Sequence, residues 1–239
     1  MNKCQVCIKY KFIINKPDVF RPLSNKYCRD CFLHEQYYSK FQYIGKGSTT
    51  FGVEIECLGL TRPATKWKIT EDGTIDGDDG YEYKSPIYNG GSSSFRNLKS
   101  MCDRLKNVNA KINESCGLHV HLGVKPTELL FEKYMYVQDW IMSTIPEDRR
   151  DNDYCSQVDG DYVDWTYMKG DHSHAFEPSY KGTVEVRCHE GTTEYEDIYH
   201  WIEFWRSFLK SEKTSDGFDI IQGKPETIKH FKQRIARFK

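Results

Sequence analysis

Cys116-Gly-Leu-His-Val-His-Leu-Gly123 is the stretch of this 239-residue sequence around which the fold can be worked out. Residues two apart in a β-strand point to the same face, so His119 and His121 would lie together on one face. The intervening Leu and Val residues would lie on the opposite face. The pattern therefore predicts a strand with one polar face and one buried face.

Two further stretches repeat this arrangement. Phe-Gly-Val-Glu-Ile-Glu places Glu54 and Glu56 on one strand face, and Thr-Val-Glu-Val-Arg does the same for Glu185 and Arg187. A third carboxylate strand, Tyr-Glu-Tyr-Lys-Ser-Pro, carries Glu82. A single histidine on a strand is usually structural, but metal ligands must converge within a few Å, and these strands could bring several donors together. We therefore predict a sheet with a polar, metal-binding concave face.

The composition is that of a packed globular protein. Lys and Arg number 34 against 35 Asp and Glu, and 14% of the residues are aromatic. The length suits one sizeable core with a small satellite. No apolar signal region and no run long enough to span a bilayer is evident, so a cytoplasmic location without membrane contact is expected. The nine cysteines are then expected to be thiols or metal ligands.

Residues 1–45 are predicted to form a separate zinc-binding module, a ribbon or knuckle, ahead of a catalytic domain at 46–239. Two Cys-x2-Cys pairs with a zinc-ribbon spacing supply four thiolates for a tetrahedral ion, namely Cys4, Cys7, Cys28 and Cys31. A redox dithiol pair or coincidence are the alternatives. The module's lysines and arginines could contact nucleic acid or another macromolecule, although a lysine-rich surface is more often a solvated face and a structural role for the module is favoured.

The second half of the sequence mixes core helices with polar loops. Apolar residues at helical spacing predict helices after Pro126 and after Thr193, and a basic helix at the C-terminal end. Arg149 and Arg150 suit the binding of a phosphate or carboxylate, with an ordinary surface pair as the alternative. Residues 156–182 are polar and aromatic, and they are a candidate lid.

From about Phe51 to Leu209 the sequence resembles the amidoligase family, a compact branch of the glutamine synthetase and glutamate–cysteine ligase superfamily often found in phages and their hosts. The resemblance rests on six short landmarks in order: Phe-Gly-Val-Glu-Ile-Glu, Asp-Gly-Thr, Tyr-Glu-Tyr-Lys-Ser-Pro, Cys-Gly-Leu-His-Val-His-Leu-Gly, Asn-x-Tyr-Cys and Gly-Thr-Val-Glu-Val-Arg. Lys84 stands where the family more often has an aliphatic residue. The zinc module lies outside the resemblance.

The resemblance implies an α+β fold in which a curved antiparallel sheet forms a bowl with helices on its convex face. It also implies a ligase that uses ATP and Mg²⁺ or Mn²⁺ to join a carboxylate to an amine through an acyl phosphate. The implied metal ligands are Glu54, Glu56, Glu82, His119 and Glu185. Arg187 would stabilise the transferring phosphoryl group, with Glu54 and Glu185 beside it in catalysis. His121 would face the nucleotide phosphates, together with Arg187 and the Arg149–Arg150 pair.

Two other classes of function remain open at this stage. One is a zinc-containing protein that binds nucleic acid or protein and has an inactive ligase-like core. The other is a metal-dependent hydrolase, because paired histidines with carboxylates also suit activation of water. The sequence identifies neither the small-molecule or peptide substrates nor the oligomeric state. The host cytoplasm is the expected location if the protein comes from a phage.

Overall fold

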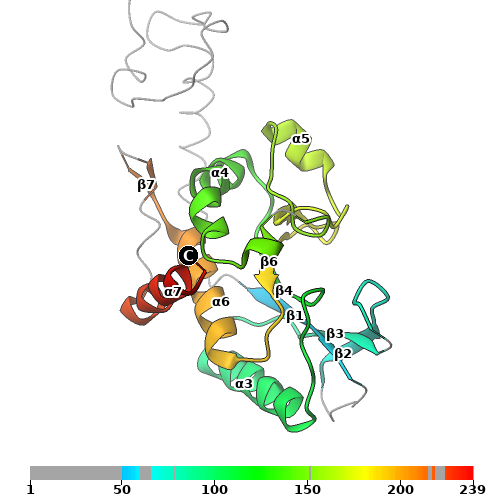
Figure 1. Cartoon of the computed structure of the whole chain (residues 1–239). Helices are drawn as coiled ribbons and strands as arrows, with labels where there is room; N and C mark the ends of the chain where they lie inside the picture. The colour runs from blue at the N-terminus through cyan, green and yellow to red at the C-terminus, as the bar shows by residue number, and fades with distance from the viewer. Residues whose placement is uncertain are drawn as a thin grey trace, which may run out of the picture.

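The computed structural model describes residues 50–59, 66–77, 79–150, 152–214, 217–218 and 224–238. The four predicted zinc ligands and the predicted domain boundary near residue 45 lie outside these ranges, so both stay predictions. Within the described ranges the chain forms helices α3 to α7, a six-stranded antiparallel sheet and a two-stranded ribbon (Figure 1).

The main sheet has the strand order β2-β3-β1-β4-β6-β5, with β1 and β4 at its centre. Its strands are β1 (Phe51–Leu58), β2 (Lys68–Glu71), β3 (Gly80–Lys84), β4 (Gly117–Leu122), β5 (Phe176–Pro178) and β6 (Val184–Glu190). The sheet is open, because β2 and β5 form two separate edges. The expected α+β class and antiparallel sheet are confirmed.

Strand register brings the polar pairs of the sequence to neighbouring positions. Glu54 on β1 lies opposite His119 on β4, and Glu56 lies opposite Glu82 on β3. On the other side of β4, His121 lies opposite Glu185 on β6. Cross-strand neighbours in an antiparallel pair project to the same face. The three polar pairs therefore share one face of the sheet.

The opposite face of the sheet is apolar and is covered by helices. These helices are α3 (Ser92–Asn107), α4 (Glu128–Met142) and α6 (Tyr195–Lys210). Phe95 of α3 contacts Phe51 of β1 with ring centroids 5.7 Å apart, and Tyr134 of α4 stacks on Phe176 of β5 at 4.2 Å. Trp205 of α6 completes this aromatic layer against Phe176 at 5.5 Å. Helix burial thus fixes which face of every strand stays open.

A register shift in the β4–β6 pair changes the direction of one histidine. Leu118 pairs with His189, whereas Val120 pairs with Val186, so one extra residue of β6 is accommodated between them. Strict alternation after Glu185 and Arg187 would place His189 on the polar face. Instead its ring is fully buried and lies 4.8 Å from the Trp201 ring on α6. The bulge therefore ends the polar face of β6 at Arg187.

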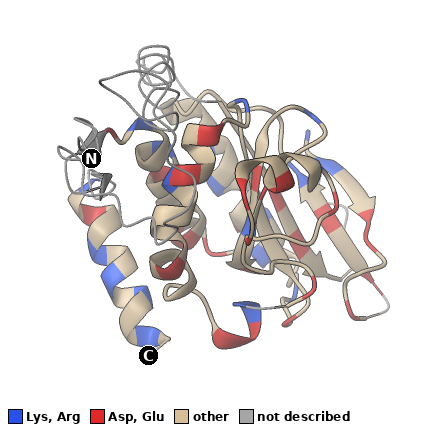
Figure 2. Ribbon diagram, turned by 90° about the horizontal axis from the view of Figure 1, so that it is seen from above, with Lys and Arg blue, Asp and Glu red and all other residues tan. Residues whose placement is uncertain are grey.

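The remaining elements surround this two-layer core. They are the 3-10 turn η1 (Glu147–Arg149), α5 (Tyr162–Tyr167), the ribbon β7 (Lys213–Thr214) and β8 (Gly217–Phe218), and α7 (Pro225–Arg237). Helix α7 packs on α6 through Phe231, which stacks on Trp201 at 5.7 Å. Figure 2 shows Lys and Arg positions in blue along the ribbon of α7, the predicted basic helix. No described helix has the length and apolar character needed to cross a membrane.

Candidate metal and phosphate site

The polar face of the sheet forms the floor of a cavity of about 480 Å³. Strands β1, β3, β4 and β6 supply the charged side chains of the floor, and the loops after β2 and before β5 supply its walls. Seven residues that the sequence singled out or implied as ligands and phosphate contacts line it: Glu54, Glu56, Glu82, His119, His121, Glu185 and Arg187. The structure thus brings together residues that are more than 130 positions apart.

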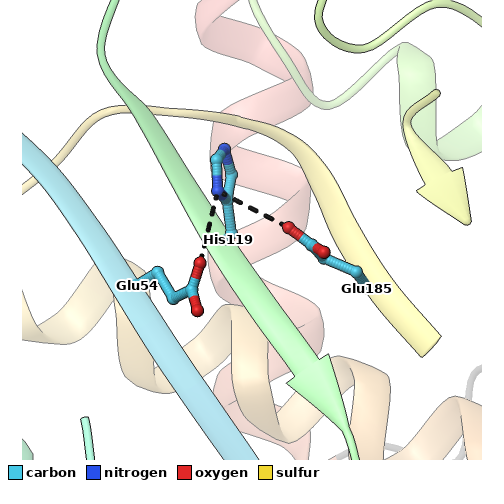
Figure 3. Close-up of side chains that lie close together, drawn as sticks. All are labelled: Glu54, His119 and Glu185. Carbon is cyan, nitrogen blue, oxygen red and sulfur yellow. Dashed lines mark ion pairs between the residues drawn. The ribbon is translucent and has the colours of Figure 1, made fainter. Parts of the chain in front are cut away.

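One group of possible ligands joins three strands around the imidazole of His119. Its Nδ1 atom lies 4.0 Å from Glu54 Oε2 and 3.7 Å from Glu185 Oε1 (Figure 3). This Nδ1 is buried and makes no hydrogen bond to any described residue. A buried nitrogen without a hydrogen bond between two carboxylates is what a metal site with two oxygen ligands and one nitrogen ligand requires. The three side chains therefore fit a divalent cation.

The other nitrogen of His119 faces a second carboxylate group. Its Nε2 lies 3.4 Å from Glu56 Oε1, and Glu56 and Glu82 complete a second group with ligand atoms within 4.8 Å of one another. Glu56 Oε2 accepts a hydrogen bond of 2.6 Å from the Gly117 backbone N–H. A Cβ at Gly117 would lie 2.8 Å from His119 Nε2, so this close approach requires glycine. One imidazole thus lies between two candidate cation positions.

Burial and neighbouring charges together set the protonation of the cluster when no cation is bound. Burial raises the pKa of Glu56 to about 7 and, with the neighbouring Glu54, raises the pKa of Glu82 to about 8. Burial also opposes ionisation of Glu54, but the hydrogen bond and charge of His121 outweigh it and hold the Glu54 pKa below its usual range. Burial and the charge of Arg187 lower the pKa of His119, which keeps the imidazole neutral. A divalent cation that binds here can displace the protons held by the buried carboxyl groups and can accept the lone pair of the neutral imidazole.

Arg187 supplies a guanidinium at the edge of the same cluster. Its Nη1 donates a hydrogen bond of 2.7 Å to Glu185 Oε1, and its Nε donates to the Tyr154 carbonyl at 3.3 Å. His121 lies on the other side of the cluster, with its Nε2 3.0 Å from Glu54 Oε1. The cavity therefore combines acidic groups that suit a hard cation with a guanidinium that suits an anionic oxygen.

Arg149 and Arg150, at the end of η1, do not line the cavity. The Nη2 of Arg149 donates to the carbonyls of Arg187 and His189, at 3.2 and 3.4 Å. Arg150 donates to the carbonyls of Ile145 and Phe238, at 3.1 Å each. Main-chain carbonyls thus accept from Nη2 of Arg149 and from two donors of Arg150, whereas the buried Nε of Arg149 makes no hydrogen bond to any described residue, so the expected phosphate contact stays a prediction. Arg149 instead lies beneath the site, next to the strand that carries Arg187.

Glu177 is a buried carboxylate that the sequence analysis did not single out. It is fully buried on β5, opposite Glu185 in the register, and its Oε1 makes no hydrogen bond to any described residue. Burial and the charge of Glu185 raise its pKa to about 8. A three-residue strand is too short for period-2 alternation to be recognised, so only the position of β6 reveals this carboxylate.

The candidate lid, residues 156–182, is partly regular structure and partly cavity wall. It contains α5 and β5, so part of it is regular structure that packs on the core through Trp165. The loop before β5 places Asp171 and His172 in the cavity wall, and Tyr180 and Lys181 follow from the loop after β5. The segment therefore forms one wall of the cavity, and its opening and closing stay a prediction.

The sequence of the cavity region matches a known family. Residues 71–178 match the family model described as "Putative amidoligase enzyme". No curated protein matches the chain. The match includes β3, β4 and β5, while β1 and β6, which carry Glu54, Glu56, Glu185 and Arg187, lie outside its limits. Both of these strands nevertheless pair directly with β4.

Proposed function

This chain belongs to the amidoligase family, a family of amide-forming ligases, and on that basis we propose that it joins a carboxylate to an amine using ATP and Mg²⁺. The observation that carries the proposal is the position of His119 between two carboxylate groups in one cavity, with Arg187 at its edge. The two parts of the proposal, the reaction and the cation, are supported separately.

The reaction follows from the poor reactivity of a carboxylate. Its leaving group would be oxide, so an amine cannot displace it directly at neutral pH. In the proposed first step a carboxylate oxygen attacks the γ-phosphorus of ATP, the bond to the β-phosphate oxygen breaks, and ADP leaves. In the second step the amine nitrogen attacks the acyl carbon of the acyl phosphate, inorganic phosphate leaves, and the nitrogen loses a proton. The products are an amide, ADP and phosphate.

The cation is proposed to be Mg²⁺, because carboxylate oxygens with one neutral imidazole suit a hard ion. Glu54, His119 and Glu185 would hold one ion, and Glu56 and Glu82 lie near a second position, which a neutral His119 would serve only in the other tautomer, because one of its two ring nitrogens carries a proton. When bound, Mg²⁺ would neutralise charge on phosphoryl oxygens.

The protein's own contribution is positioning and charge. Arg187 offers donors to the transferring phosphoryl group from a position fixed by its hydrogen bond to Glu185. His121 reaches the cavity between Glu54 and Glu185, where it can contact the same phosphates. The wall formed by residues 171–181 would limit the access of water to an acyl phosphate.

Calorimetric titration of a non-hydrolysable ATP analogue tests the proposal. We expect binding that requires Mg²⁺ in the wild type and is lost in Glu185→Ala, which removes a ligand and the partner of Arg187. Glu196→Ala is the matched control, because that side chain is 73% exposed on α6, and it should bind as the wild type does. Absence of Mg²⁺-dependent binding in the wild type would contradict the proposal.

A turnover assay then tests the reaction itself. With hydroxylamine as the amine and a panel of carboxylates as acids, ADP and hydroxamate should form together only when both reactants are present. Cation binding without any nucleotide binding would instead favour hydrolysis by an activated water.

A further inference from the structure

A second hollow of about 510 Å³ lies beside the acidic cavity. It is formed by the beginning of β1, the beginning of β2, the segment after β3, the end of β4 and the loop before β6. The two hollows share four lining residues, namely Glu54, Lys84, His121 and Lys181. A molecule in the second hollow could therefore reach the ligands of the first without crossing the protein.

The second hollow has the opposite charge to the cavity. Its described lining includes four lysines, Lys66, Lys68, Lys84 and Lys181, and one carboxylate, Glu54. Lys84 and Lys181 lie at the boundary, with their Nζ atoms 3.6 and 3.5 Å from the two oxygens of Glu54. Charge of one sign focused in a hollow attracts a ligand of the other sign. This lining suits an anion.

Repulsion between two of the lysines lowers the stability of the sheet. Lys68 on β2 lies directly opposite Lys84 on β3, so both side chains project to the same face. Like charges directly opposite each other in an antiparallel pair are destabilising. The positive charge of Lys84 is partly compensated, because Lys84 also forms an ion pair with Glu82. Among the described residues, no carboxylate forms an ion pair with Lys66 or Lys68. Both of these side chains are exposed, and a bound anion would offset the repulsion between their charges.

We propose that this lysine-lined hollow holds the carboxylate substrate, and that this substrate carries at least one further anionic group besides the carboxylate it activates. The inference rests on the proposed ligase function. The reactive carboxylate would lie near Glu54 and His121, where the hollows join, and the second anionic group would lie between Lys66 and Lys68. The triphosphate is left to the acidic cavity, which has the cation ligands and Arg187. The substrate class is therefore a dicarboxylate or an acidic peptide.

Matched pairs of small acids test the charge requirement in the full-length chain. The probes are glutarate, adipate and pimelate, each compared with its own monoamide, which has nearly the same shape and one negative charge less. Dissociation constants are measured at low salt in the presence of Mg²⁺ and the ATP analogue. The wild type should bind at least one dicarboxylate about three- to tenfold more tightly than its monoamide, as expected for two exposed ion pairs.

The variant Lys66→Gln/Lys68→Gln should reduce this ratio to about one. Lys229→Gln/Lys232→Gln removes the same charge from exposed positions on α7 and should keep the wild-type ratio. A wild-type ratio of one for all three pairs, or a ratio that Lys66→Gln/Lys68→Gln retains, overturns the proposal. So does a loss of ATP-analogue binding in that variant, because the hollow would then serve the triphosphate. Failure of the ligase proposal itself is separate: the wild type would not bind the ATP analogue with Mg²⁺.

Discussion

Replacing Glu177 by Gln should make the folded protein more stable as the pH rises, relative to the wild type. Glu177 is fully buried, and its pKa is raised from 4.5 to about 8. The folded state therefore retains a proton on this carboxyl that the unfolded state releases above pH 4.5. Since the unfolded state then binds fewer protons, wild-type stability falls between pH 4.5 and 8. Gln mimics the protonated carboxyl and has no proton to lose.

The size of the effect follows from the shift. The pKa of Glu177 is about 4.5 in the unfolded state and about 8 in the folded state. Its ionisation in the unfolded state therefore lowers the unfolding free energy of the wild type by about 1 kcal/mol at pH 5 and about 3 kcal/mol at pH 7. The difference in unfolding free energy between Glu177→Gln and the wild type should thus grow by about 2–3 kcal/mol from pH 5 to pH 7. This comparison cancels any constant change in packing that the amide causes.

Urea unfolding at pH 5, 6 and 7 in the presence of a chelator measures the effect. Glu190→Gln is the matched control on the neighbouring strand. Burial alone would raise the Glu190 pKa, but His189 and Arg234 lower it, so its loss should destabilise the protein by a nearly constant amount over this range. If the difference for Glu177→Gln does not change with pH, or changes in the opposite direction, then Glu177 is ionised in the folded state and the reasoning is refuted.

Three more predictions concern the metal site. Gly117→Ala should weaken Mg²⁺-dependent binding of the ATP analogue at least tenfold, because its Cβ would lie 2.8 Å from His119 Nε2, whereas Gly73→Ala, with open space around it, should not. Cation binding should release protons and become tighter from pH 6 to pH 8, because burial raises the pKa of Glu56 to about 7 and that of Glu82 to about 8. Calorimetry in buffers of different ionisation enthalpy measures the proton release. Cation affinity that does not change with pH would contradict this prediction. Removing Mg²⁺ with a chelator should lower Tm more at pH 8 than at pH 6, where protons already neutralise part of the cluster; an equal fall at both pH values would contradict this.

The strands that carry the candidate site were predictable because their alternation is simple. His-x-His and Glu-x-Glu each have apolar residues between the polar ones, and burying one face leaves the other polar in only one register. The structure confirms these segments as β4 and β1, paired with Glu54 opposite His119. Their roles as metal ligands stay predictions.

Other parts of the site depend on relations that no local pattern contains. Glu177 acquires its environment from Glu185 across a strand pair of three residues, and His189 is turned into the core by a bulge. The Arg149–Arg150 pair is predicted to suit phosphate, but it lies outside the cavity lining and donates to the distant carbonyls of Arg187 and Phe238, contacts that no local pattern reveals. The lysine-lined hollow likewise exists only because β2, β3 and the loop before β6 meet.

The central place of β4 ties the site to the folding of the core. A slip of β4 by one residue would turn Leu118, Val120 and Leu122 towards the cavity and press His119 and His121 into the helix layer. Such a chain would bury imidazoles without partners and leave leucines in water, so it would be far less stable than the native one. The packing that stabilises the sheet therefore also disfavours the misaligned forms. Chains that reach the folded state arrive with their ligand strands already in register.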